Sequence, residues 1–232
     1  IFCKIHFPYY FDKSQIVAII NKGNNQIAEI SKLYASKNLK LTFIKADMSE
    51  YIEINQLIQD IKSIFEYPDI ILHLAAPKLE LIRATKFDPN SLIKDTNIQL
   101  VSIGLIMKAF IKKMSKTNTV SKVIFMLSSV TIGKPPKYMS QYTAVKYALL
   151  GYMNSLCVEF HDKPIIFNSI SPSMINTKFL SNIPEKYIEM AALSNSSGSN
   201  AEVSDITPII HFLISNDSNY LNGVNIPATK GN

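Results

Sequence analysis

Three kinds of side chain that can carry proton transfer lie close together in the second half of the chain. Ser128 and Ser129 end an apolar run that predicts a β-strand, a polar loop follows, and a helix then opens with Tyr142 and Lys146 one turn apart. Residues at positions i and i+4 share a helix face, and open α/β sheets bind ligands at the carboxyl ends of their strands. This order predicts a hydroxyl, a phenol and an ammonium group around one small volume.

The spacing of tyrosine and lysine is not specific by itself, because the chain has 11 tyrosines and many lysines. Tyr9 and Lys13 repeat the spacing, but no strand or serine precedes them. Context therefore selects Tyr142. The alternatives at this level are an ordinary surface pair at a helix start, a plain turn residue at Ser129, and Ser128 as the functional hydroxyl.

The elements that would position these groups follow from the pattern of the whole chain. Short apolar runs alternate with helical stretches, and the runs are continuous, as expected for strands covered on both faces of a parallel sheet. The order predicts a single α/β domain with a doubly wound, Rossmann-like parallel sheet, right-handed crossovers and helices on both faces. We expect strands at Gln15–Ile20, Leu41–Ala46, Ile70–Ala76, Lys122–Ser129, Ile165–Ser171 and Gly223–Ile226, and helices at Asn25–Lys37, Ile52–Phe65, Ser91–Lys113, Tyr142–His161 and Val203–Leu213.

The composition suits one globular domain, with 232 residues of which 47% are hydrophobic. The net charge is +6, but the lysines are scattered and form no basic stripe with aromatics, so we expect no nucleic-acid partner. A solvated surface or attraction to anionic ligands explains the charge. Cys3 and Cys157 lack the spacing of metal ligands. No apolar run reaches the roughly 18 residues of a membrane-spanning helix, and the first residues do not have the pattern of a signal peptide. We therefore expect no metal, no membrane partner and a cytoplasmic protein.

Several segments together resemble the short-chain dehydrogenase/reductase family, in its single-domain branch. Ser129 lies thirteen residues before Tyr142, the offset found in that family. The other segments are similar to its long central helix, its Pro-Gly…Thr segment beside the nicotinamide, and its closing strand. They are FDPNSLIKDTNIQLVSIGLIMKAFIKKM with Asn97, NSISPSMINTKF with Pro172 and Thr177 but Ser173 in place of glycine, and FLISNDSNYLNGVNIPATKGN with Gly223.

The resemblance implies one NAD(P)-binding domain over residues 1–232 and a substrate lid loop at 178–202, within which the polar stretch Leu193–Asn200 is typical of a mobile loop. It also implies a homo-oligomer, a dimer or tetramer, formed through the Asn97 and Tyr142 helices. The substrate would be a small carbonyl or alcohol compound of unassigned identity.

The phosphate-binding turn of the family, T-G-x-x-x-G-x-G, does not occur in this sequence. The first glycine is Gly23, which follows the strand expected at Gln15–Ile20. That strand would be the family's second, and the order 3-2-1-4-5-6 places the first strand in the centre of the sheet. We expect a chain that lacks its N-terminal strand and a gap between two half-sheets with unpaired edges. The alternatives are a variant without cofactor binding and a sheet completed by another chain.

The resemblance also implies roles in a carbonyl–alcohol interconversion by hydride transfer. Tyr142 would be the general acid in reduction and the base in oxidation. Lys146 would lower the pKa of Tyr142 and bind the nicotinamide ribose, and Ser129 would polarise the substrate carbonyl. Asn97 would organise a water-linked proton path from Lys146; otherwise it is a solvated helix residue.

The implied cofactor contacts are spread along the chain. Asp47 and Met48 would lie beside the adenine, although Asp47 is also suited to capping the next helix. Lys22, at the end of the second strand, favours the 2′-phosphate of NADP, with NAD as the alternative. The remaining contacts would be Ala75 and Ala76, in place of the family's Asn-Asn-Ala-Gly, Pro172 and Thr177 beside the nicotinamide, and Tyr142 and Lys146 themselves.

Leu74 and Ala76 depart from that motif, and we expect His73, which precedes the site on a buried strand, to be structural. Two other functions stay open. One is a catalytically silent binding or regulatory protein on the same scaffold. The other is a sugar-nucleotide epimerase or dehydratase, which the HLAA segment suggests but for which the chain has no length left for a substrate domain.

Overall fold

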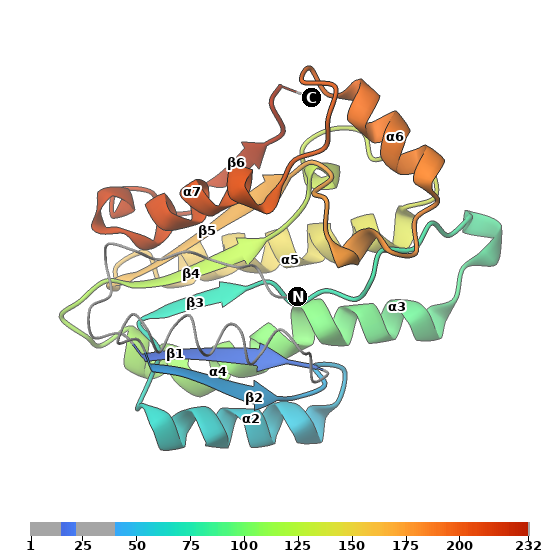
Figure 1. Cartoon of the computed structure of the whole chain (residues 1–232). Coiled ribbons are helices and arrows are strands. Elements are labelled where there is room, and N and C mark those ends of the chain that lie inside the picture. Colours follow the sequence, from blue (N-terminus) through green and yellow to red (C-terminus); the bar gives the residue numbers. More distant parts are fainter. Residues whose placement is uncertain (1–14, 22–39, 232) are drawn as a thin grey trace.

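The strands form two parallel sheets in the computed structural model, which describes residues 15–21 and 40–231 (Figure 1). In the first sheet β1 (Gln15–Ile20) pairs with β2 (Lys40–Lys45). The second sheet has the order β3-β4-β5-β6. Its strands are β3 (Ile70–His73), β4 (Ser121–Met126), β5 (Ile165–Pro172) and β6 (Asn225–Ala228). The parallel α/β class predicted from the continuous apolar runs is confirmed.

The expected gap is present between β1 and β3. Figure 1 shows β1 on the side of its sheet that lies toward β3, and no backbone ladder joins these two strands within the described ranges. The order is therefore β2-β1, a break, and β3-β4-β5-β6, as the sequence predicts for a sheet without the central strand. Lys22, Gly23 and the helix expected at Asn25–Lys37 lie outside the described residues.

Helices cover both faces of the larger sheet because neighbouring strand residues point to opposite sides. Val123 and Phe125 of β4 enter the main core with α4 (Ser102–Met114) and α5 (Ser140–Glu159). Ile124, between them, packs instead against α7 (Val203–Ile214). The main core also contains residues of β2 and of α2 (Tyr51–Ile64), so side-chain packing joins the two sheets. This arrangement is the doubly wound sheet expected.

The single helix expected at Ser91–Lys113 is instead three consecutive elements. They are α3 (Pro89–Thr96), a π-helical turn η2 (Asn97–Val101) and α4. The Asp88 side chain accepts a hydrogen bond from the Asn90 N–H, 3.0 Å, and starts α3 two residues earlier than predicted. Hydroxyls of Thr96 and Ser102 on either side of the turn bond to carbonyls four residues back. Such side chains compete with the regular helical ladder.

A second difference is α6 (Glu185–Ser194), which occupies much of the segment expected to be a loop. Residues 178–202 are therefore not loop throughout, and the polar stretch becomes irregular only after Ser194. The strands expected to reach Ala76 and Ser129 end at His73 and Met126, because the chain turns away from the sheet there. None of the described helices combines the length and apolar character needed to cross a bilayer.

Candidate active site

A cavity of about 510 Å³ opens at the carboxyl ends of the strands of the larger sheet. Of the predicted catalytic residues, Ser129, Tyr142 and Lys146 line it, and Asn97 does not. Ser128 and Ser129 enter it from the end of β4, and Tyr142 and Lys146 from the first two turns of α5. The structure therefore brings together the hydroxyl, phenol and ammonium groups that the sequence predicts to converge.

The environment of Tyr142 is apolar. Its ring contacts that of Phe179 at a centroid distance of 6.1 Å, and it packs against a small hydrophobic cluster that includes Leu180 and Ile183. Burial raises the pKa of Tyr142 to about 12, and a hydrogen bond with the Ser128 side chain acts in the opposite direction. The phenol is consequently protonated at neutral pH and can act as a proton donor.

Lys146 is buried, with 3% of its surface exposed. Its Nζ donates a hydrogen bond of 2.8 Å to the Met126 carbonyl at the end of β4. Burial lowers the pKa of Lys146 to about 7. Its Nζ lies 5.6 Å from the centroid of the Tyr142 ring.

The expected lowering of the Tyr142 pKa by Lys146 stays a prediction, because the shift of Tyr142 is due to burial and to Ser128. Desolvation disfavours the charged form of both groups, raising the pKa of the Tyr142 phenol and lowering that of the Lys146 ammonium. A lysine of near-neutral pKa can hold or release a proton in the working range.

The two serines differ in their contacts. Ser128 precedes the short helix η3 (Ser129–Thr131), and its Oγ accepts a long hydrogen bond, 3.5 Å, from the Val130 N–H. Ser128 is also the serine hydrogen-bonded to Tyr142. Ser129 begins η3 and lines the cavity one residue further along. Contact with the tyrosine thus belongs to the serine that the sequence offered as the alternative.

Asn97 is the first residue of the π-turn, a structure that is frequent at functional sites. Its Oδ1 accepts a hydrogen bond of 3.4 Å from the Tyr51 hydroxyl. The described residues show no hydrogen bond between Asn97 and Lys146, so the expected proton path stays a prediction. No sequence pattern predicts the widened turn, since no proline or glycine interrupts the helical pattern between Asn97 and Val101.

His73 secures the other side of this turn. Its imidazole is 5% exposed, and its Nε2 lies 2.7 Å from the backbone oxygen of Gln99, so Nε2 carries the proton that it donates. Burial lowers the pKa of His73 to about 4, with a smaller contribution from Lys146. The ring also meets Phe125 edge-on at 6.2 Å. These contacts support the structural role expected for His73, and they tie the end of β3 to the π-turn.

The residues predicted to contact a cofactor divide into two groups. Ala76, Pro172 and Thr177 line the cavity together with Tyr142 and Lys146. The others lie away from it, or in the case of Lys22 outside the described residues. Ala75 packs against the main core.

Asp47 and Met48 follow β2, outside the cavity. Asp47 accepts hydrogen bonds from the N–H and the hydroxyl of Ser49, at 2.9 and 2.7 Å, which lower its pKa. It forms a local turn, and Glu50 occupies the N-cap position of α2, so the capping alternative for Asp47 is wrong in detail. The side chain of Met48 is buried in the main core.

Sequence reasoning missed the apolar wall of the cavity. Its residues come from separate segments that no local pattern connects, among them Leu79, Met139, Met174, Phe179 and Leu180. All five also belong to or pack against the small hydrophobic cluster with Val130 and Ile183, while Lys134 lines the cavity from the loop before α5. No group of His, Cys, Asp or Glu in the described part of the chain is arranged to hold a metal ion.

Comparison with known proteins gives one consistent result. Residues 14–232 match a family model described as enoyl-(acyl carrier protein) reductase. The chain is 31% identical over 192 residues to the 3-oxoacyl-[acyl-carrier-protein] reductase FabG of Buchnera aphidicola subsp. Baizongia pistaciae, covering 81% of this chain and 76% of the relative. It is 27% identical over 230 residues to the NADPH-dependent aldehyde reductase 2, chloroplastic, of Arabidopsis thaliana, covering 95% and 80%.

Solved structures share the fold at lower identity. Levodione reductase is similar with a TM-score of 0.82 at 21% identity, covering 94% of this chain and 87% of that one. A blue fluorescent protein from a metagenomic library, solved in complex with NADPH, has a TM-score of 0.84 at 18% identity and coverages of 95% and 89%.

Proposed function

The chain belongs to the short-chain dehydrogenase/reductase family, and on that premise we propose that it is an NAD(P)-dependent oxidoreductase that interconverts a carbonyl and an alcohol. The observation that carries this proposal is the cavity lined by Ser128, Ser129, Tyr142 and Lys146 at the carboxyl ends of the strands. These groups can bind a carbonyl oxygen and deliver a proton to it, and the apolar wall excludes water.

We propose that Tyr142 donates its phenolic proton to the carbonyl oxygen during reduction. With its pKa raised to about 12, the phenol is fully protonated at neutral pH. When bound, a nicotinamide cofactor supplies the hydride. Lys146, whose pKa lies at about 7, is the group suited to returning a proton to the tyrosine. We propose reduction as the working direction, in keeping with NADP as the preferred cofactor.

The two serines would bind different groups in the site. Ser128, through its hydrogen bond, would fix the orientation of the phenol. Ser129, which enters the same cavity, would donate to the carbonyl oxygen and polarise it. We propose Asn97 as the holder of a water that links Lys146 to solvent, because it opens the π-turn beside the site.

The residues at the cavity fit the nicotinamide end of a dinucleotide. An ammonium group has three N–H donors, and the described residues give Lys146 one acceptor, the Met126 carbonyl. The remaining donors suit the hydroxyls of a ribose, and Ala76, Pro172 and Thr177 would border the ring.

We propose NADP as the preferred cofactor, with NAD as the alternative. A relative is named as an NADPH-dependent aldehyde reductase, and similar folds have been solved with NADP and with NAD. Lys22, Asp47 and Met48 stay candidates for the adenosine end.

We also propose a homo-oligomer that uses the outward face of α5. Ala144, Ala148 and Gly151 follow one another along this face and are exposed, so a second helix could approach closely. The inner face of the helix is also apolar, and its residues Val145, Leu149 and Met153 are buried. Small or apolar residues on both faces fit a helix that packs against its own core on one side and against a second subunit on the other.

The decisive test is the Tyr142→Phe variant, assayed by NADPH and NADH oxidation with a panel of aldehydes and ketones. Loss of a general acid should lower kcat by between about a hundredfold and ten-thousandfold, with an unchanged circular dichroism spectrum. Tyr147→Phe, on the exposed face of the same helix, is the matched control. Wild-type turnover by Tyr142→Phe would refute the assignment. Cofactor binding by the wild type without turnover of any carbonyl would favour a silent scaffold protein.

A further inference from the structure

The cavity has two chemically different ends. Its polar groups concentrate around the serines, Tyr142 and Lys146, whereas the wall toward the lid is apolar. That wall is continuous with the small cluster in which Leu79, Met139 and Leu180 are buried. A volume of about 510 Å³ is in the range of sites for ligands larger than a two- or three-carbon alcohol. The cavity therefore suits a carbonyl compound with an extended apolar body.

Cationic side chains lie on, or pack against, the loop that borders this cavity. Lys134 lines the cavity and is exposed, on the loop that joins η3 to α5. Lys137 lies on the same loop, also exposed. The next residue, Tyr138, has a positive φ of 69°, a conformation that bulky residues rarely adopt and that is found at ligand sites.

Two contacts hold this loop against the segment that carries Arg83. The Ile82 N–H donates a hydrogen bond of 2.7 Å to the Tyr138 carbonyl. The Arg83 guanidinium lies over the Tyr138 ring, 5.6 Å from its centroid. The energetically disfavoured backbone of Tyr138 is thus supported from the neighbouring segment, which brings the Arg83 guanidinium onto the loop that carries Lys134 and Lys137. We define the cationic lip as Arg83, Lys134 and Lys137.

No member of the cationic lip forms an ion pair within the described residues. In residues 15–21 and 40–231 the ion pairs are Lys113–Glu66 and Lys163–Asp162, and neither includes a member of the lip. The two carboxylates that flank Arg83 in the sequence have other partners: Glu80 accepts a hydrogen bond of 3.3 Å from the Asn182 side chain, and Asp88 accepts one of 3.0 Å from the Asn90 N–H. Clustered charge of one sign beside a low-dielectric cleft attracts ligands of the opposite sign.

We infer that the substrate is an anionic amphiphile: its carbonyl lies at Tyr142, its apolar body fills the cavity, and a carboxylate or phosphate is held by the cationic lip. This inference rests on the proposed function and specifies its substrate class. Binding would be steered by Lys134, which lines the cavity itself, with Arg83 and Lys137 adding to the potential at its mouth.

The test compares matched substrates that differ only in charge. One pair is a medium-chain oxo acid, with carbonyl and carboxylate at opposite ends, and its methyl ester. The second pair is an oxoacyl thioester of phosphopantetheine and the same thioester of pantetheine. For each pair, the ratio of kcat/KM for the anionic to the neutral compound is measured with NADPH and the full chain. We expect a ratio above one that falls as salt is added.

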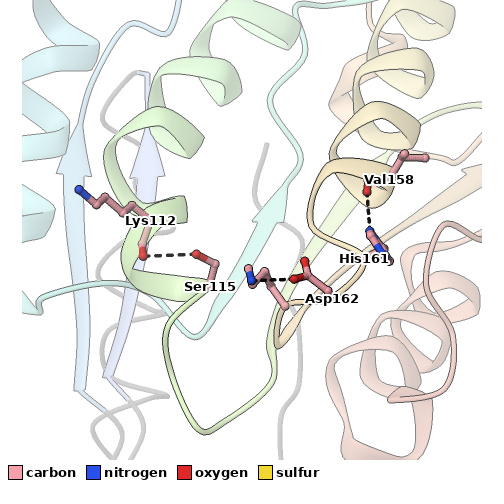
Figure 2. A network of polar contacts seen from close by, with 6 residues as sticks. Lys112, Ser115, Val158, His161 and Asp162 are labelled. Carbon is pink, nitrogen blue, oxygen red and sulfur yellow. Dashed lines mark hydrogen bonds and ion pairs between the residues drawn. The ribbon is translucent and has the colours of Figure 1, made fainter.

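Variants locate the source of the preference. Lys134→Gln should lower the ratio about fivefold, through KM, since partly exposed charge pairs contribute up to about 1 kcal/mol; Lys137→Gln should lower it less. Lys112→Gln is the matched control, because it removes one positive charge at the other end of the molecule. Figure 2 shows the Lys112 side chain directed away from the polar network in which its carbonyl accepts from Ser115.

The outcomes separate the two proposals. A ratio near one in both pairs, unchanged by Lys134→Gln, would overturn the anionic substrate and leave the reductase function in place. A larger preference in the carboxylate pair or in the thioester pair supports the inference and identifies the anion. If no carbonyl is turned over, the proposed function fails. Calorimetry with octanoate and octanamide then tests separately whether the cavity binds an anionic amphiphile. Tighter octanoate binding that depends on Lys134 supports an anion site, and equal affinities refute it.

Discussion

Acidification should destabilise this protein through His73, because burial disfavours the doubly protonated, charged form of its imidazole. The ring is buried, and its protonated nitrogen is committed to the Gln99 carbonyl at the π-turn. Burial lowers the pKa of His73 from its ordinary 6.5 to about 4. The unfolded chain therefore binds a proton near pH 6.5, whereas the folded chain does so only near pH 4.

The sign and the size of the effect follow from this difference. A depressed folded-state pKa means that stability is full above pH 6.5 and is lost as the pH falls toward 4. At 1.36 kcal/mol per pH unit, the interval corresponds to about 3 kcal/mol of unfolding free energy. Asp95 acts in the opposite direction over an overlapping range, because burial raises its pKa to about 6. Lys146 contributes mainly above pH 7.

Comparison of two chains isolates the histidine from these other groups. Urea unfolding of the wild type and of His73→Gln, which keeps an N–H donor for Gln99, should be measured from pH 7.5 to 4. The stability difference between them should shrink by about 3 kcal/mol across the acid range. His161→Gln, an exposed imidazole in the network of Figure 2, should follow the wild type. A difference independent of pH would refute the reasoning.

Two further predictions concern the serines and a glycine. Ser128→Ala should raise the pKa that governs oxidation of an alcohol substrate, since it removes a hydrogen bond that favours the phenolate of Tyr142. Ser129→Ala should lower kcat without moving the pH profile. The reverse pattern would show that the two serines have exchanged roles. Gly223→Ala should cost about 1–3 kcal/mol, because its φ is +80° and an added Cβ would lie 3.0 Å from the Cys157 Sγ. Gly133→Ala meets no atom within 4 Å and serves as control in the same denaturation assay.

Much of the architecture was predictable because parallel strands buried on both faces leave a strong local signal. The runs at Gln15–Ile20 and Ile165–Ser171 are continuous and apolar, and they form β1 and β5 within one residue of the predicted ends. The gap beside β1 was also predictable, since it depends only on the order of the elements. The helix Glu185–Ser194 was not, because its short helical sequence merges into a polar stretch that indicates a loop.

The convergence of the serines, Tyr142 and Lys146 was predictable, but the apolar wall of the cavity and its electrostatics were not. Sequence spacing brings Tyr142 and Lys146 onto one face of α5, but it does not reveal how far each is removed from water. Desolvation decides both pKa values, and it arises from distant segments such as the one that carries Phe179. The choice between Ser128 and Ser129 likewise depends on the path of η3 after β4 ends.

The π-turn at Asn97–Val101 sets the rotational phase of the two helices that it joins. A π-turn is equivalent to one residue inserted into an α-helix, and each residue of an α-helix advances the side chains by about 100°. The stripe that α4 buries, with Ile103, Met107 and Phe110, is therefore about one residue out of phase with α3. Deleting one residue from the turn would restore a regular helix and would force either that stripe or α3 to rotate away from its present neighbours.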